Sequence, residues 1–531
     1  MNYKIYFIGF RLISVFFLSH SCICFAQAQV DISTSTVEKF QNFQKSRPAE
    51  KVFIHTDRDM FSPGQNLWFK AYVVEATSHK GAAPSNVLYV DLLGPDSSFY
   101  IHRVLDVQSG VAHGEMFLPV DMPAGNYVLR GHTRYMQNFP DEYMFRKEIS
   151  VLDPYQKTPF TNISESAAAS QGSNVRKQKP VLDVQFFAEG GHLASNMVNQ
   201  LAFKALDKNG KGIPVEGAIY SVKNDSLLSF SSNALGMGKV PLFAEKGERY
   251  KARVNYNNEE FTFPLPASED NAYILSGAIR SNVLFVQAAN NFNDDMAGAF
   301  IVLHIRGHVL HVVEGKGNGH ISSKLSTAGL PEGILTMTLF DRAAKPVSER
   351  LLFVENPKSG APVEVKPGAA VYGNRQPVDI QFELAGAVDS VNLSMTIVRQ
   401  DFAGSMTREN IRTYLLLSSD LQGEIELPGQ YFDPANENRK DDLDVLLLTQ
   451  GWRRILWEDV LSDNPMGVVI PPEEGLSIIG QIVDFYKRDE GREGTVRLGL
   501  MEDMMFEEEA VSDEQGYFIF PNLNYEDTLN F

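Results

Sequence analysis

The stretch VFIHTDRDMFSPGQNLWFKAYVV, residues 52–74, constrains the fold more than any other part of this chain. It begins with a short β-rich run and continues through a polar turn, in which Pro63 fixes one φ angle and Gly64 is conformationally free. Residues 67–73 then alternate between two faces of a second strand. One face holds Leu67, Phe69, Ala71 and Val73, and the other holds Trp68, Lys70 and Tyr72. The apolar face needs a partner sheet, and this pattern is no catalytic signature.

This stretch resembles the second macroglobulin-like domain of the α2-macroglobulin family. The matching positions, a TDR step, an aromatic residue and a PG turn between two strands, are Thr56, Asp57, Arg58, Phe61, Pro63 and Gly64. The run AGNYVLRGHTRYMQNF, residues 124–139, fits the closing strands of the same domain. The resemblance implies a macroglobulin-like β-sandwich over residues 49–153. Because neighbours in a strand point to opposite faces, we expect Asp57 and Arg58 not to bridge each other.

The N-terminus has the features of a secretory signal peptide. Lys4 and Arg11 precede an apolar run, and Ala26-Gln27-Ala28 is a small-x-small cleavage site. The sequence therefore predicts a signal peptide over residues 1–28 and an exported protein, in the periplasm or at the outer membrane. A retained membrane anchor is disfavoured because the apolar run is short and interrupted. Lipidation at Cys22 stays open.

Cysteine usage excludes several classes of chemistry. Both cysteines, Cys22 and Cys24, lie within the predicted signal peptide. The mature chain would then have no disulfide, no cysteine nucleophile and no zinc–thiolate site. It would also lack the thioester cysteine with which large macroglobulins trap proteases.

The chain is strongly acidic. Removing Lys4 and Arg11 from the 48 basic residues leaves 46 against 66 acidic ones, which gives about −20 for the mature protein. This balance disfavours nucleic acid and anionic lipid as partners. No mature stretch reaches the roughly 18 apolar residues of a transmembrane span.

The remaining chain reads as an all-β protein of tandem macroglobulin-like or immunoglobulin-like β-sandwiches joined by linkers, with a few short helices. Residues 29–48 form an N-terminal segment in which Val37, Phe40 and Phe43 have helical spacing. Residues 154–180 are rich in Ser, Ala and Gln and predict a flexible linker. Turn signals divide β-rich runs into further sandwiches at 181–268, 269–357 and 358–472.

The domain at 358–472 departs from a pure β pattern. Strands are expected at residues 378–384 and 391–398, whereas residues 410–417 and 441–461 have helical spacing. We therefore expect a helical insertion, in which Trp452 and Trp457 pack between domains. Glycan stacking is the alternative for these tryptophans.

The last domain, residues 473–531, resembles the carboxypeptidase regulatory-like β-sandwich. Its matching residues are Gly480, Val483, Asp484, Ser512, Asp513, Gly516, Phe518 and Phe520. Envelope proteins that combine such domains often continue into the plug domain of a TonB-dependent receptor. On that comparison we expect the domain to need one further strand after Phe531, and whether a plug domain follows is left open.

Three groups of residues are candidates for binding sites. His304, His308 and His311 are expected on one strand, where positions four apart are separated by about 13 Å and cannot share an ion. Gly315, Gly317 and Gly319 are expected in a hairpin connection rather than a phosphate loop. The acidic run with Glu502, Asp503, Glu507, Glu508 and Glu509 lacks the spacing of a calcium loop. The sequence therefore predicts no catalytic, cofactor-binding or metal-binding residues and no cofactor.

Three functions remain. The first is a non-enzymatic cell-envelope scaffold for protein–protein interaction, with an outer-membrane transporter among its possible partners. The second is a macroglobulin-type endopeptidase inhibitor that acts without a thioester, with residues 154–180 as an exposed bait segment. The third is a glycan-binding protein.

Overall fold

The computed structural model describes residues 32–81, 83–95, 98–153, 182–356, 363–384, 391–398, 409–451, 454–462, 468–487, 490–499 and 507–523. In these ranges β-strands predominate and form many small sheets, antiparallel except for the β2–β8 pair, so the prediction of tandem β-sandwiches with a few short helices is confirmed. The predicted signal peptide at 1–28, the linker at 154–180, and Trp452, Glu502 and Asp503 lie outside these ranges.

The first sandwich contains a three-stranded sheet, β1-β3-β6, that packs on a five-stranded sheet, β2-β8-β7-β4-β5. Two 3₁₀ turns, η1 (Tyr135–Asn138) and η2 (Asp141–Tyr143), join β7 to β8. The strands are β1 (Glu50–Thr56), β2 (Met60–Phe61), β3 (Asn66–Glu75), β4 (Val87–Leu93), β5 (Phe99–Asp106), β6 (Val111–Phe117), β7 (Gly125–His132) and β8 (Phe145–Val151).

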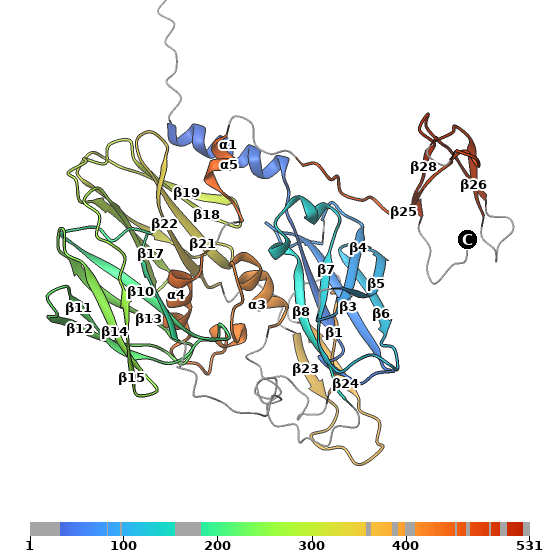
Figure 1. The fold of residues 1–531 in the computed structure, drawn as a ribbon, viewed down its shortest axis with the longest axis horizontal. Helices are drawn as coiled ribbons and strands as arrows, with labels where there is room; N and C mark the ends of the chain where they lie inside the picture. The colour runs from blue at the N-terminus through green and yellow to red at the C-terminus, as the bar shows by residue number, and fades with distance from the viewer. Residues whose placement is uncertain are drawn as a thin grey trace, which may run out of the picture.

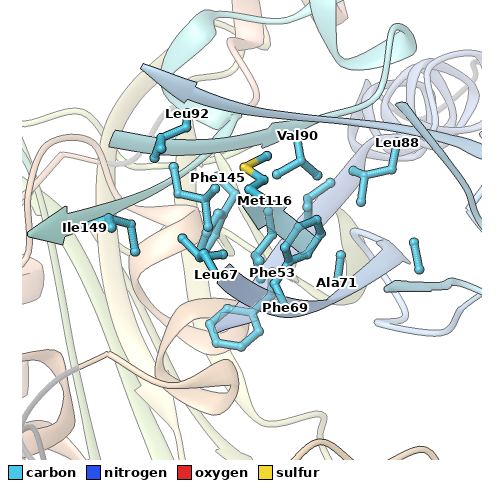
Figure 2. Packing of buried hydrophobic residues seen from close by; sticks show 14 of the residues in the cluster. Phe53, Leu67, Phe69, Ala71, Leu88, Val90, Leu92, Met116, Phe145 and Ile149 are labelled. Carbon is cyan, nitrogen blue, oxygen red and sulfur yellow. The ribbon is translucent and has the colours of Figure 1, made fainter. Parts of the chain in front are cut away.

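The expected alternation in β3 is observed. Leu67, Phe69, Ala71 and Val73 are buried between the two sheets. Figure 2 shows Leu67, Phe69 and Ala71 facing residues of the opposite sheet such as Val90 and Ile149. Trp68, on the other face of β3, is 58% exposed. The period-2 pattern thus accounts for this core.

Asp57 and Arg58 differ from expectation, because the Nε of Arg58 lies 3.2 Å from a carboxylate oxygen of Asp57. The prediction assumed that both residues lie in a strand. Strand β1 ends at Thr56 and Asp57 begins a bend, so the opposite-face rule does not apply. Asp57 also accepts a hydrogen bond from the backbone N–H of Trp68 at 3.0 Å.

The second sandwich packs the sheet β13-β10-β9 on the sheet β12-β11-β14-β15. Its core centres on phenylalanine rings, with Phe203 and Phe230 4.6 Å apart between ring centroids. The strands are β9 (Leu182–Ala188), β10 (Met197–Asp207), β11 (Glu216–Ser221), β12 (Ser226–Ser231), β13 (Met237–Ala244), β14 (Tyr250–Tyr256) and β15 (Glu259–Pro264).

The third sandwich packs the sheet β16-β17-β20 on the sheet β19-β18-β21-β22. A two-residue turn, Arg306-Gly307, joins β18 to β19, and both residues have positive φ values of 49° and 84°, as a tight hairpin turn requires. The strands are β16 (Tyr273–Arg280), β17 (Val283–Asn290), β18 (Phe300–Ile305), β19 (His308–Glu314), β20 (His320–Ser326), β21 (Gly333–Phe340) and β22 (Pro346–Val354).

Strand β21 is buried along its whole length, unlike a strand with one solvent face. Leu335, Met337 and Leu339 point into the core of the third sandwich. Ile334 and Phe340, on the opposite face, belong to other apolar clusters. This outer face is therefore covered by parts of the chain outside the sandwich.

Helices supply that cover. The N-terminal helix α1 (Ile32–Ser46) includes the expected Val37, Phe40 and Phe43, and it lies beside α5 (Trp457–Leu461) on the third sandwich (Figure 1). The other helical elements lie between the first sandwich and the second and third (Figure 1). These elements are α3 (Ile411–Leu416), η3 (Ser418–Asp420), η4 (Pro428–Tyr431) and α4 (Arg439–Thr449). We call residues 409–462 the helical segment.

The region before the helical segment contains one two-stranded sheet, β23 (Val363–Pro367) paired with β24 (Ile380–Leu384). The prediction of a strand at residues 391–398 is wrong, because these residues form no strand. They lie instead on the first sandwich, where the Ser394 hydroxyl contacts His55 at 2.7 Å and Tyr72 at 2.8 Å. The hydrogen bonds of this hydroxyl are therefore made with side chains of the first sandwich, not with the backbone of a neighbouring strand.

The last described domain consists of two two-stranded sheets around a small apolar cluster. In one sheet β25 (Leu476–Gln481) pairs with β28 (Tyr517–Leu523). In the other, β26 (Thr495–Gly499) pairs with β27 (Glu507–Val511).

Trp457 packs between domains, as expected from the sequence. Its ring lies 4.8 Å from Phe40 of α1 and 4.7 Å from Phe340 of β21, measured between centroids. Its indole N–H donates a hydrogen bond to the Thr338 hydroxyl at 3.1 Å. Trp457 therefore joins the helical segment, α1 and the third sandwich.

We predict that Trp457→Ala lowers the free energy of unfolding by about 3–5 kcal/mol, because it opens a cavity between the buried rings of Phe40 and Phe340. The measurement is guanidinium denaturation followed by circular dichroism. Trp68→Ala removes the same side chain from an exposed site and should change the free energy by less than about 0.5 kcal/mol. Equal effects of the two substitutions would contradict the packing role of Trp457.

Candidate interdomain site

Lys51 is fully buried, although lysine is among the residues least often buried. It lies in β1, in register with Val74 of β3, and points out of the sandwich toward the helical segment. Its ammonium donates hydrogen bonds to the carbonyl of Leu415 at 2.9 Å and to Nε2 of His79 at 3.1 Å. The third contact is Asp420, at 2.8 Å. All three donors of the ammonium thus have partners.

Asp420 comes from η3, which directly follows α3. Helix α3 is held in position at its start by a capping box between Asn410 and Thr413. In its middle, Tyr414 enters the core of the first sandwich, 5.3 Å from Phe145 between centroids. Arg454 then contacts Asp420 at 3.0 Å and donates two hydrogen bonds to the carbonyl of Ser419. The carboxylate of Asp420 is therefore shared by two cations.

The third sandwich reaches the same place through Arg306 of the β18–β19 turn. Arg306 donates to the carbonyl of Thr77 in the first sandwich at 2.9 Å and to the carbonyl of Glu332 at 2.7 Å. The carboxylate of Glu332 accepts a hydrogen bond from Arg412 of α3 at 2.7 Å. We call the group Lys51, His79, Arg306, Asp420 and Arg454 the junction cluster.

The protonation states follow from burial and from the excess of positive charge. Burial lowers the pKa of Lys51 to about 7, Asp420 opposes this shift, and Arg454 and Arg306 add to it. Burial lowers the pKa of His79 to about 2, and Lys51, Arg306 and Arg454 contribute. His79 is therefore neutral at physiological pH and accepts the hydrogen bond from Lys51.

A cavity of about 120 Å³ adjoins the junction cluster. It lies between the end of α1, the first sandwich, the β18–β19 turn and the helical segment. Its lining combines aromatic and aliphatic side chains with charged ones, including Phe43, Arg47, Phe139, Arg306, Arg454 and Ile455.

A second ionic group joins the helical segment to the second and third sandwiches. Arg350 of β22 is buried, and it contacts Glu189, at the end of β9, at 2.6 Å and Asp444 of α4 at 2.5 Å. Asp444 also contacts Lys239 of β13 at 2.6 Å. Charged side chains from three parts of the chain thus meet around one buried guanidinium.

A histidine–aspartate pair lies on the five-stranded sheet of the first sandwich. Asp91 is fully buried and lies 2.6 Å from Nδ1 of His102, its register partner on β5. Arg130 of β7 donates two hydrogen bonds to the other carboxylate oxygen, at 3.1 and 2.8 Å. Arg130 neutralises Asp91, so this arrangement is an ion-pair cluster across three strands.

The three histidines of this run lie on two strands, although the sequence pattern predicted one strand. His304 lies near the C-terminal end of β18, and His308 and His311 lie on β19 after the turn. His304 is buried against Phe40, and burial lowers its pKa to about 3. In the described parts of the chain, no group of three or more His, Cys, Asp and Glu residues could hold a metal ion.

The glycines and the acidic run also have defined positions. Gly315, Gly317 and Gly319 connect β19 to β20, which belong to different sheets, so the expected hairpin is wrong and the connection crosses between sheets. Glu507, Glu508 and Glu509 lie on β27, and Glu509 pairs with Arg497 at 2.6 Å.

Sequence reasoning missed the junction cluster. Lys51 stands in an apolar β-strand next to Glu50, and nothing in the local pattern distinguishes it from an edge lysine that points to solvent. Asp420 lies in a polar SSD turn. The one available signal was the unusual length of the helical pattern in an otherwise all-β chain.

Comparisons with known proteins give similarities at low sequence identity. No family model and no curated relative matches the chain. Among solved structures, the match to native Escherichia coli α2-macroglobulin covers 64% of this chain and 25% of the macroglobulin chain, at 9% identity and a TM-score of 0.17. Salmonella α2-macroglobulin reacted with methylamine matches 65% and 25%, at 11% identity and a TM-score of 0.18.

Dimeric latent PorU from Porphyromonas gingivalis matches 58% of this chain and 34% of its own, at 11% identity and a TM-score of 0.24. This chain thus spans about a quarter to a third of the length of these proteins. The TM-scores are all below 0.5, and no functional conclusion follows from them.

Removing the charge of Asp420 should be costly. We predict that Asp420→Asn lowers the free energy of unfolding by about 3–5 kcal/mol, because Lys51 and Arg454 lose their shared buried anion. The matched control is Glu424→Gln, which breaks the exposed pair with Lys211 and should cost less than about 1 kcal/mol. Calorimetry on both variants decides the matter, and a loss below 1 kcal/mol for Asp420→Asn would refute the role of the pair.

Lys51 should also make stability depend on pH. Its pKa in the folded state, about 7, lies below the ordinary value of 10.5, so the unfolded chain binds more protons between these values. Stability should therefore rise from pH 7 to pH 9 by up to about 1.4 kcal/mol per pH unit relative to Lys51→Met. His79 is neutral throughout this range. Identical pH profiles of the two proteins, measured by denaturation, would contradict the shift.

Proposed function

We propose that the protein is a non-enzymatic scaffold of the cell envelope that holds β-sandwiches in a defined arrangement for protein–protein interaction. The observation that carries this proposal is the packing of the helical segment against three sandwiches. Tyr414 belongs to the core of the first sandwich. Leu443 and Leu446 of α4 pack with Met237 of the second and Ile334 of the third. An arrangement built in this way is rigid where separate domains on linkers would not be.

The attachment and the exposed side chains of the last domain support a role in binding a partner. Residues 468–475, which we call the tether, precede this domain and are bound to the first sandwich through Asn138, which makes hydrogen bonds to the backbone of Val469 and Ile470. Glu473 of the tether accepts a hydrogen bond from Tyr89 at 3.0 Å. Beyond the tether, Phe485 and Tyr486 are 81% and 91% exposed. Exposed aromatic side chains of this kind are frequent at protein interfaces.

The proposal includes export to the periplasm or outer membrane, as the N-terminal sequence predicts, and an outer-membrane transporter as the partner. Among the described residues, no helix combines the length and apolar character needed to cross a bilayer. The acidic net charge of −18 is consistent with a protein partner rather than nucleic acid.

We predict that a photo-cross-linking amino acid at Tyr486, introduced in cells that produce the protein naturally, forms a covalent adduct with a protein of the outer-membrane fraction. The control position is Val222, which is 59% exposed on the second sandwich. Equal capture at both positions, or adducts confined to soluble proteins, would contradict the proposal.

Incubation of the protein with a protease distinguishes the scaffold function from the function of a macroglobulin-type inhibitor. The inhibitor would be cut by a protease within residues 154–180 and would then reduce the activity of that protease on a large substrate. A scaffold would be cut without any loss of protease activity, and its fragments would remain associated because the helical segment contacts both sides of the cut. Inhibition after cleavage would therefore favour the inhibitor.

A further inference from the structure

We propose that the cavity beside the junction cluster binds a small organic carboxylate whose apolar body is about the size of one ring. The cavity is separate from the surface through which the scaffold would meet a protein partner. The ligand class follows from four observations: the charge of the lining, an unsatisfied donor, the apolar walls and the volume.

The lining is positively charged, although the chain as a whole is acidic. Arg47, Arg306 and Arg454 line the cavity together with Asp420 and Asp459. Asp420 already contacts both Lys51 and Arg454. The lining therefore holds three arginines against two aspartates, within a protein of net charge −18. An anionic ligand would balance this excess in a place of low dielectric constant, where charge interactions are strong.

Arg47 supplies an unsatisfied donor. It follows the last turn of α1, and its guanidinium lies 5.5 Å from the ring centroid of Phe43 and 5.3 Å from that of Phe139. Its Nε is buried and has no hydrogen-bond partner among the described residues. The single hydrogen bond of its Nη2, to the carbonyl of Asn138, is long, at 3.5 Å. A buried donor without a partner costs about 1–3 kcal/mol, and a carboxylate is the acceptor that best fits a guanidinium.

The rest of the lining is apolar. Phe43, Phe139, Ile455 and Leu456 form walls, and Ala49 and Ala76 leave space between them. Leu456 is 42% exposed, so the cavity has a rim at the surface. The volume of about 120 Å³ is smaller than the roughly 150 Å³ of an apolar cavity that holds one benzene ring, so a ring would fit with one edge at the open rim. A carboxylate with a single ring or a short branched chain therefore matches both the charge and the size.

Binding should be coupled to proton uptake. Lys51 faces His79, Asp420, Arg454, Arg306 and the carbonyl of Leu415, and its pKa is lowered mainly by burial and further by the two arginines. A negative charge in the cavity opposes the arginines and raises the pKa of Lys51, which is partly neutral near pH 7. The protein should then take up a fraction of a proton as the ligand binds.

The test is isothermal titration calorimetry on the purified full chain at pH 7, with benzoate as the probe and benzamide as its neutral analogue. We expect benzoate to bind at least tenfold more tightly than benzamide. The heat of benzoate binding should change between two buffers of different ionisation enthalpy, because a proton is taken up. Equal affinity for the two probes, or no heat with benzoate at millimolar concentration, would overturn the proposal.

Two variants locate the site. Arg47→Met removes the unsatisfied donor, and Ala49→Leu fills the cavity without changing any charge, so each should weaken benzoate binding at least tenfold. Arg249→Met, at an exposed arginine of the second sandwich, should leave it unchanged. Thermal unfolding of each variant verifies that it is folded. Benzoate affinity that is equal to the original in folded Arg47→Met and Ala49→Leu would place the binding elsewhere and refute the assignment.

Discussion

The buried contact between Lys51 and Asp420 is the interaction on which the arrangement of the domains depends. Moving an ammonium out of water costs several kcal/mol, and only well-placed partners offset that cost. The partners of Lys51 come from the helical segment, apart from His79 of its own sandwich. An apolar side chain at this position could be buried against many surfaces. The ammonium requires a carboxylate and a carbonyl at defined places, so it permits one docking of α3 and η3 on β1.

Around this contact, the helical segment performs the task that linkers perform in a string of separate domains. Tyr414 of this segment enters the core of the first sandwich, and Leu446 and Trp457 pack in apolar clusters on the outer faces of the other sandwiches. The three sandwiches are therefore joined through apolar surface that each buries against one common element, and relative motion of any two would expose that surface. The last domain is attached differently, by the polar contacts of its tether with Asn138 and Tyr89. The last domain is therefore attached less rigidly than the three sandwiches are to one another.

Much of the fold could be predicted because the strands of β-sandwiches show their alternation of apolar and polar residues within short stretches of sequence. The alternation of residues 67–73 and the apolar face of α1 depend on near neighbours, and both are found in the structure. Predictions failed where distant residues decide. Residues 391–398 have the composition of a strand, yet Ser394 is bound by His55 and Tyr72 from the first sandwich. The histidine run was placed on one strand because the turn at Arg306-Gly307 was not recognised. The junction cluster could not be found, since burial of Lys51 depends on a segment with no sequence pattern in common with β1.

Tyr414 has a consequence for the order of folding. It packs against Phe53 and Phe145 in the first sandwich, although more than 250 residues separate it from the nearer of the two along the chain. Domains form in the order in which a ribosome releases them, from the N-terminus onward. The earliest sandwich must therefore persist with an open core until synthesis has passed the helical segment. The part of the protein that is made first is among the last to be finished.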